Sequence, residues 1–276
     1  MNDLIKRSLT GAVYVAVMLG GIVIHPFVFA AVYVVILFLT QSEFYKIYEN
    51  AGYAPHKVFG LISGVSLFAL FFLVADHVIP YIFILFSVPF IFFVFIAELL
   101  RSNNNAIKNS SLTLFGLVYV ALPFSLLNFI VFVPKMLGGS VYYPWILAGI
   151  FFIIWSYDSM AYFSGSMLGK HRIASKISPK KSWEGLIGGA VFAVIISLVC
   201  AVLFQEISMF EWVVISLIIV IFGTLGDFFE SKLKRELGLK DSSDFLPGHG
   251  GLLDRFDSLI FSVPVIFIWL NLIDKF

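Results

Sequence analysis

Long apolar runs follow one another along almost the whole chain, separated by short polar segments. A helix needs about 20 mainly apolar residues to cross the hydrocarbon core of a bilayer. Nine runs come close enough to that length to be predicted as membrane-spanning helices, and His25-Pro26 separates the first two because proline disfavours a continuous helix. The predicted ranges are 9–24, 27–47, 57–75, 79–99, 112–133, 144–169, 184–204, 209–235 and 255–272. The pattern therefore predicts an all-α polytopic membrane protein with about nine spans.

The polar residues between these runs are unevenly placed. Residues 156–258 hold 21 of the 35 charged side chains, whereas residues 1–155 hold 12. We therefore expect residues 1–140 to form an N-terminal group of five transmembrane helices. Residues 141–276 are expected to form a C-terminal catalytic region of four spans, with a polar site at the cytoplasmic face.

Lysine and arginine indicate the orientation of the predicted spans. Nine spans place alternate loops on opposite sides of the membrane, and 16 of the 18 basic residues then fall on one side, with Lys135 and Lys275 on the other. Cytoplasmic loops carry the excess of Lys and Arg. The pattern predicts a cytoplasmic N-terminus and an outside C-terminus.

Composition narrows the function classes. The chain is 60% hydrophobic and 13% charged, whereas soluble domains are about 25% charged, so a water-soluble globule is excluded. The net charge of +1 lacks the clustered basic excess that nucleic-acid binding requires, and we expect no nucleic-acid partner. Cys200 is the single cysteine, which excludes an intramolecular disulfide and a cysteine-rich metal site.

A first polar segment begins at Asp158, inside the sixth predicted span, and continues beyond that span to Gly185. Asp158 ends a stretch of uncharged residues, and a carboxylate at membrane depth costs about 2.5–3.5 kcal/mol on insertion scales, so it should face the bundle interior or water. Residues 178–185 are typical of a helix start, in which Ser178 or Ser182 caps and Pro179 occupies the first turn. Capping does not explain Lys180-Lys181, which beside a helix N-terminus would form a phosphate-binding edge.

A second polar segment, residues 226–258, carries the strongest signal. If the eighth span continues as a helix, Asp227, Glu230, Ser231 and Lys234 share one face, because residues three and four apart are neighbours. Asp254 and Asp257 are likewise one turn apart at the start of the ninth span. Residues 247–251, Pro-Gly-His-Gly-Gly, form a flexible turn whose amides can approach an anion.

These residue types indicate a hard-cation site. Aspartate and other oxygen donors, without cysteine or paired histidine, suit Mg²⁺ with phosphate oxygens completing its shell. His249, between glycines, is either a base or a turn residue. A phosphate nucleophile is already ionised at neutral pH and needs no general base, which disfavours a direct catalytic role for His249. We place His249 among the expected substrate-binding residues.

The same segments resemble a known family. Residues 231–257 contain Ser-Lys-Leu-Lys-Arg from Ser231, Lys240-Asp, Ser243, Leu246-Pro, His249-Gly-Gly-Leu and Asp254-Arg-Phe-Asp257, which together are similar to the signature of phosphatidate cytidylyltransferases, also called CDP-diglyceride synthases. Residues 158–162 and 178–185 resemble that family in order and distance. The likeness covers roughly residues 150–260, and the first half matches in hydrophobic character and length.

The resemblance implies a membrane enzyme of phospholipid biosynthesis that joins CTP to phosphatidate, giving CDP-diacylglycerol and pyrophosphate. It also implies a nine-span helical fold, a homodimer and a paired-cation centre, with Mg²⁺ and a second, monovalent cation. The cytoplasmic site suits a bacterial inner membrane.

The resemblance and the residue pattern together give a set of expected site residues. We expect Asp227 and Asp254 to be the metal ligands. The expected catalytic residues are Asp227, Ser231, Lys234, Asp254 and Asp257. The expected substrate-binding residues are Asp158, Lys180, Lys181, Arg235, Lys240, His249 and Arg255.

Alternatives remain at the level of sequence. A CTP-dependent polyisoprenoid kinase also combines many spans with a nucleotide site. A CDP-alcohol phosphotransferase is disfavoured because no run resembles its Asp-Gly, Ala-Arg and multiple-Asp signature. Intramembrane acids also line ion pathways in transporters, but here the ionisable residues gather at the cytoplasmic ends of the predicted spans rather than at mid-membrane.

Overall fold

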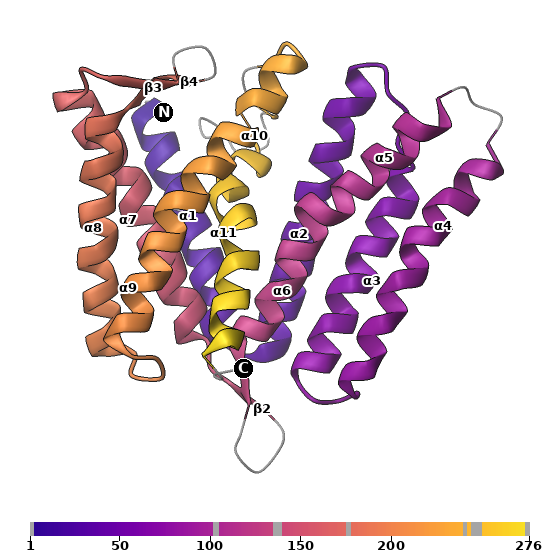
Figure 1. Cartoon of the computed structure of the whole chain (residues 1–276), viewed down its shortest axis with the longest axis horizontal. Helices are drawn as coiled ribbons and strands as arrows, with labels where there is room; N and C mark the ends of the chain where they lie inside the picture. The colour runs from indigo at the N-terminus through magenta and orange to yellow at the C-terminus, as the bar shows by residue number, and fades with distance from the viewer. Residues whose placement is uncertain are drawn as a thin grey trace. The chain divides into compact units, whose positions relative to one another are not determined.

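The structure is a computed structural model that describes residues 3–101, 105–134, 140–174, 178–239, 242–243 and 250–273. The chain forms two compact units (Figure 1). The first unit comprises residues 1–143, 241–255 and 275–276, and the second comprises residues 144–240 and 256–274. The prediction that residues 141–276 form the catalytic region stays a prediction.

The first unit is built from helices with one short hairpin. Helices α2 and α3 pack against each other, and α3 also packs against α6 (Figure 1). The elements are α1 (Asp3–Val23), α2 (Pro26–Asn50), α3 (Lys57–Ala75), the 3₁₀ turn η1 (Tyr81–Ser87), α4 (Val88–Leu99), α5 (Ala106–Gly116), the π-helical turn η2 (Leu117–Ala121), α6 (Leu122–Val131), β1 (Phe132–Pro134) and β2 (Ser140–Tyr142).

The second unit is also helical, and its longest contact joins α7 to α8 along their lengths (Figure 1). Its elements are α7 (Trp145–Leu168), β3 (Arg172–Ala174), β4 (Ser178–Ser182), α8 (Trp183–Leu203), α9 (Met209–Ile218), the π-helical turn η3 (Ile219–Gly223), α10 (Thr224–Glu236) and α11 (Leu253–Leu272). Helix α11 begins in residues of the first unit and continues through the second.

The predicted helical character is confirmed. Each of the nine predicted ranges is helical over its described residues, with boundaries that differ by a few positions. Seven helices of the described chain are long and apolar enough to cross a membrane, and residues 10–23 form a shorter apolar helix. The protein is therefore an all-α polytopic membrane protein, to which two short antiparallel hairpins, β1–β2 and β3–β4, are added.

Two predicted helix starts can be checked directly. Helix α2 begins at Pro26, and its amide at Phe27 donates to Nδ1 of His25, as the predicted break requires. Ser182 caps α8, with its Oγ accepting from the amide of Gly185 at 3.2 Å. The prediction that Pro179 lies in a first helical turn is wrong, because residues 178–182 pair with residues 172–174 as a strand before the helix begins.

Hydrogen bonds connect the loops of the first unit in two groups, one at each end of its helices. At one end, Tyr142 donates to the carbonyl of Ile22, and Ser140 contacts Asp76 at 3.4 Å. At the other end, Arg101 donates to the carbonyl of Ala54 at 2.7 Å, which joins the loop after α2 to the loop after α4. This grouping agrees with the alternation of loops predicted from the span order.

Close packing inside the first unit depends on small residues. The hydroxyl of Tyr45 donates to the carbonyl of Thr113 at 2.8 Å and accepts from Gln41 at 3.1 Å. A side chain at Gly60 or Gly116 would overlap the Tyr45 ring.

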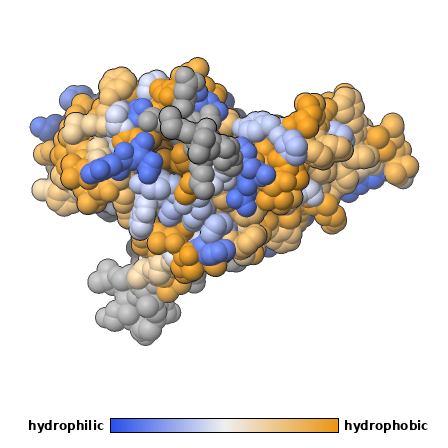
Figure 2. Space-filling view, turned by 90° about the horizontal axis from the view of Figure 1, so that it is seen from below, coloured by the Kyte–Doolittle hydropathy of each residue, from blue (hydrophilic) through white to orange (hydrophobic). Residues whose placement is uncertain are grey.

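Many outward-facing side chains are large and apolar. In the space-filling view, the hydrophilic side chains gather in patches on a mostly hydrophobic surface (Figure 2).

Candidate active site

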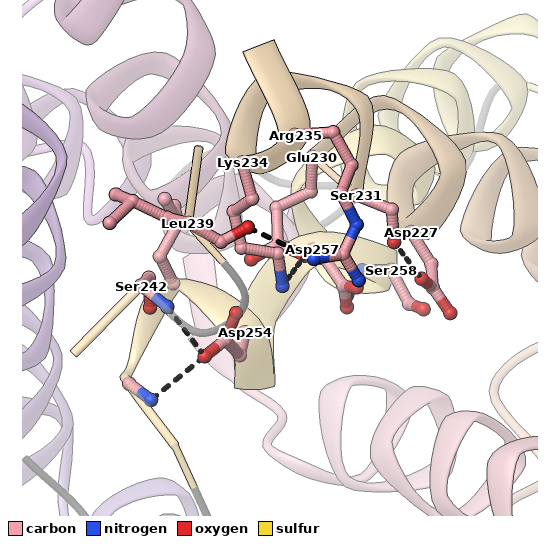
Figure 3. A network of polar contacts seen from close by, with 12 residues as sticks. Asp227, Glu230, Ser231, Lys234, Arg235, Leu239, Ser242, Asp254, Asp257 and Ser258 are labelled. Carbon is pink, nitrogen blue, oxygen red and sulfur yellow. Dashed lines mark hydrogen bonds and ion pairs between the residues drawn. The ribbon is translucent and has the colours of Figure 1, made fainter. Parts of the chain in front are cut away.

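One face of α10 presents acidic, hydroxyl and basic side chains in succession (Figure 3). The hydroxyl of Ser231 donates to Oδ1 of Asp227 at 3.3 Å, and Nζ of Lys234 lies 2.7 Å from Oε2 of Glu230. Both pairs have a spacing of four residues, at which helical side chains are neighbours. The π-helical turn η3 directly precedes α10, and such turns change the direction in which the following residues face.

Asp257 brings a third carboxylate to this face. Asp227, Glu230 and Asp257 each offer an oxygen, and these oxygens lie within 4.8 Å of one another. Gly226 permits the approach, because a methyl group there would collide with the carbonyl of Asp257 and lie 3.1 Å from Cβ of Phe261. We call Asp227, Glu230 and Asp257 the acidic cluster.

Lysines contact two members of the acidic cluster. Lys181, from β4, forms an ion pair with Asp227, and its Nζ lies 4.4 Å from the centre of the Phe228 ring. Lys234 pairs with Glu230, and the two side chains are 12% and 2% exposed. Closely spaced carboxylates repel one another unless cations or protons offset their charge, so these lysines stabilise the arrangement.

The position of Tyr157 ties α7 to the same region. Its hydroxyl hydrogen-bonds with Thr224 in the first turn of α10. The next residue, Asp158, is exposed. The expectation that this carboxylate faces water or the bundle interior stays a prediction.

Asp254 is held by backbone amides of its own unit. Its Oδ2 accepts from the amide of Gly251 at 2.9 Å and from the amide of Ser242 at 3.2 Å (Figure 3). Asp254 and Asp257 are one turn apart on α11. The amide of Gly251, in the turn expected to approach an anion, is thus directed to a carboxylate of the protein itself.

The remaining expected residues fall into two groups. Lys180, Arg235 and Arg255 are exposed, with the Lys180 carbonyl accepting from Arg172 at 2.9 Å and the Arg235 guanidinium donating to the Leu239 carbonyl at 3.1 Å. Lys240 and His249 lie outside the described residues. The substrate-binding roles expected for these five residues stay predictions.

Two carboxylates outside the expected set lie beside expected site residues. Glu230, on the predicted face of α10, has an oxygen within 4.8 Å of oxygens of Asp227 and Asp257. Glu43 lies in α2 and contacts the segment that carries Asp254. The sequence contains a signal for Glu43, because it is a carboxylate near the end of a predicted span. The same argument singled out Asp158.

Comparison with known proteins adds an independent finding. Residues 5–273 match the family described as the cytidylyltransferase family. The chain is 35% identical over 216 residues to the phosphatidate cytidylyltransferase of Staphylococcus aureus strain COL, covering 76% of this chain and 78% of that protein. It is 46% identical over 121 residues to the protein of that name from Bacillus subtilis strain 168, covering 44% and 45%. For the Haemophilus influenzae protein of that name the identity is 44% over 124 residues, covering 43% of each chain.

Proposed function

The chain belongs to the cytidylyltransferase family, and from that premise we propose that it transfers the cytidylyl group of CTP to phosphatidate, giving CDP-diacylglycerol and pyrophosphate. The observation that carries this proposal is the acidic cluster, flanked by Lys181 and Lys234, inside the matched region. Carboxylates beside lysines suit substrates that are polyanions handled with a cation.

The reaction needs positioning and charge stabilisation more than acid–base chemistry. A phosphate oxygen of phosphatidate attacks the α-phosphorus of CTP, and a new P–O bond forms as the bond to the β-phosphate breaks. Pyrophosphate leaves with the bonding electrons. The protein must align the two phosphate groups and stabilise the charge that develops on the leaving group.

We propose that Mg²⁺ binds the carboxylates. Oxygen ligands at short range are what this cation prefers, and Asp227, Glu230 and Asp257 provide them within 4.8 Å. When bound, Mg²⁺ supplies positive charge to the nucleotide phosphates. Asp254 stays proposed as a ligand with Asp227, and a second, monovalent cation stays proposed from the family resemblance.

The lysines are proposed to bind phosphate. Lys181 and Lys234 each contact one carboxylate, so each ammonium group lies beside the proposed cation site. Nucleotide phosphates bound there would attract both ammonium groups, in addition to the cation. Ser231, hydrogen-bonded to Asp227, orients that carboxylate.

We further propose nine spans, a cytoplasmic N-terminus and a homodimer in a bacterial inner membrane. The charge distribution of the loops supports the orientation. The contact of Lys181 with Asp227 joins the loop before α8 to the C-terminal end of the predicted eighth span. Both lie on the same side in the predicted span order, so the contact supports the alternation of the loops. A site at the cytoplasmic face lets soluble CTP meet a lipid substrate.

A labelled-nucleotide assay tests the proposed function. Purified protein in detergent micelles is given phosphatidate, Mg²⁺ and CTP labelled either in cytosine or at the γ-phosphate. We expect cytosine label in lipid, release of labelled pyrophosphate, and loss of both with chelator. Polyprenol in place of phosphatidate tests the polyisoprenoid kinase alternative, which predicts γ-phosphate label in lipid without cytosine. Such a result, or no cytosine label with phosphatidate, would reject the proposal.

A further inference from the structure

Glu43 is a buried carboxylate in the first unit, far from residues 231–257 in the chain. It lies in α2, within the predicted span of residues 27–47, and is 8% exposed. Burying a carboxylate in such a helix costs free energy unless hydrogen bonds or opposite charge offset it. A buried carboxylate at this position therefore requires donors nearby.

The donors belong to a segment that consists of Ser242 and residues 250–253. The amide of Leu252 donates to Oε2 of Glu43 at 2.9 Å, and the amide of Leu253 donates to Oε1 at 3.2 Å. The hydroxyl of Ser242 donates to Oε1 as well. Leu253 is the first residue of α11, so Glu43 accepts from the start of a helix, where amide groups lack partners within the helix and favour negative charge.

Glu43 and Asp254 hold the same short segment. Ser242 donates through its hydroxyl to Glu43 and through its amide to Asp254. The next two donors are adjacent backbone amides: that of Gly251 donates to Asp254, and that of Leu252 donates to Glu43. Displacing this segment from Glu43 would thus move the groups that fix the Asp254 side chain.

Two glycines permit the close approach of this turn to the carboxylates. A side chain at Gly251 would overlap both Glu43 and Ser242, and Gly250 has φ +79°, a conformation that glycine adopts without strain. The carboxylate of Asp254 would lie 2.7 Å from a Cβ at Gly250. The two glycines therefore let the segment close around the two carboxylates.

We propose that Glu43 is a positioning residue for Asp254. By accepting from Ser242, Leu252 and Leu253, it fixes the start of α11 and thereby the direction of the Asp254 carboxylate. The inference rests on the proposed function, in which Asp254 is a ligand of Mg²⁺. It assigns to the N-terminal half of the chain a part in the reaction, although the signature residues lie in the C-terminal half.

Hydrogen–deuterium exchange tests the contact without substrate or metal. Glu43→Gln keeps the side-chain size but replaces one acceptor oxygen by a donor group, so it cannot accept all three hydrogen bonds. In full-length protein in detergent we expect faster exchange of the Leu252 and Leu253 amides. The matched control is Glu49→Gln on the same helix, which removes an exposed partner of Lys57 and should leave that exchange unchanged. Unchanged exchange in Glu43→Gln would overturn the proposal.

A magnesium titration of CDP-diacylglycerol formation separates positioning from general stability. Glu43→Gln should raise the Mg²⁺ concentration for half-maximal activity about 10- to 100-fold, the range for residues that orient a metal ligand. Saturating Mg²⁺ should restore much of the rate, whereas destabilised protein would lose activity at every concentration. Glu49→Gln should behave as the unchanged protein does.

A second variant covers the case in which Glu43→Gln does not insert. Ser242→Ala removes one donor to Glu43 and keeps the amide that binds Asp254, so a smaller shift in the same direction is expected. An unshifted Mg²⁺ requirement in the variant or variants that insert, despite faster exchange, would overturn the positioning role. If unmodified protein forms no CDP-diacylglycerol, the proposed function fails, and the exchange comparison still decides whether Glu43 holds the segment.

Discussion

Asp227 belongs to the acidic cluster, accepts a hydrogen bond from Ser231 and forms an ion pair with Lys181. Asp227→Asn keeps its shape and removes its negative charge. We expect CDP-diacylglycerol formation to fall about 100-fold or more, the scale on which loss of one preorganised charge-stabilising group acts. Assays over a Mg²⁺ titration, with gel filtration to verify insertion and folding, measure this. Asp76→Asn, in a loop where Asp76 contacts Ser140, is the control, and wild-type activity in Asp227→Asn would contradict the metal assignment.

Lys180 and Lys181 are adjacent, yet the structure separates their roles. Lys181 pairs with Asp227, whereas Lys180 is exposed. We therefore expect Lys181→Ala to raise the apparent KM for CTP or phosphatidate more than Lys180→Ala does. Steady-state kinetics of both single variants measure this difference. Equal effects would mean that the pair acts as a diffuse positive surface, and unchanged kinetics in both would reject a substrate-binding role.

Local spacing predicted the residues that meet on one helix but not those that meet across the chain. The face formed by Asp227, Glu230, Ser231 and Lys234 follows from helical periodicity alone, and the structure confirms that these residues share it. The contact of Glu43 with Leu252 spans 209 positions. No periodicity in a single sequence encodes such a contact, because it depends on how separate helices pack.

At the scale of elements, Gly226 sets the distance between α10 and α11. Gly226→Ala would push the added methyl group into the carbonyl of Asp257. Overpacking of this kind costs about 1–3 kcal/mol, and the shift should also spread the acidic cluster. We expect a lower thermal unfolding midpoint in detergent together with a raised Mg²⁺ requirement.

A glycine with room for a methyl group provides the control for this prediction. A methyl group at Gly20, in α1, would have Cδ1 of Ile24 as its nearest neighbour, at the ordinary van der Waals distance of 3.8 Å. Gly20→Ala should therefore leave both the unfolding midpoint and the Mg²⁺ requirement close to those of the unmodified protein. If Gly226→Ala behaves in the same way, close approach at Gly226 is not needed for the site.

The helices were predictable because hydrophobic length dominates their formation in a bilayer. The short elements between them were not. Residues 178–182 have the composition of a helix start, but pairing with residues 172–174 holds them as a strand. The π-helical turns η2 and η3 also left no pattern in the sequence, since one extra residue in a turn changes neither composition nor overall apolar length.

At the scale of the whole molecule, the family resemblance read from residues 231–257 is confirmed by the match over residues 5–273. The resemblance was limited to the second half because the first half offers mainly apolar residues for comparison. Contacts such as those of Glu43 give that half a physical connection to the segment with Asp254. Apolar composition in a membrane helix therefore conceals single polar positions that matter for the site.

The proposed orientation predicts which loops a reagent can reach. In a Cys200→Ala background, Lys108→Cys places a thiol in the first turn of α5, at the end proposed to be cytoplasmic, and Gln205→Cys places one in a loop proposed to lie outside. Both positions are exposed. A membrane-impermeant maleimide should label Gln205→Cys in intact spheroplasts but Lys108→Cys only after permeabilisation, because the bilayer excludes the charged reagent. Retained synthase activity verifies folding of each variant. Labelling of Lys108→Cys in intact spheroplasts, with Gln205→Cys protected, would reverse the orientation and place the acidic cluster away from cytoplasmic CTP.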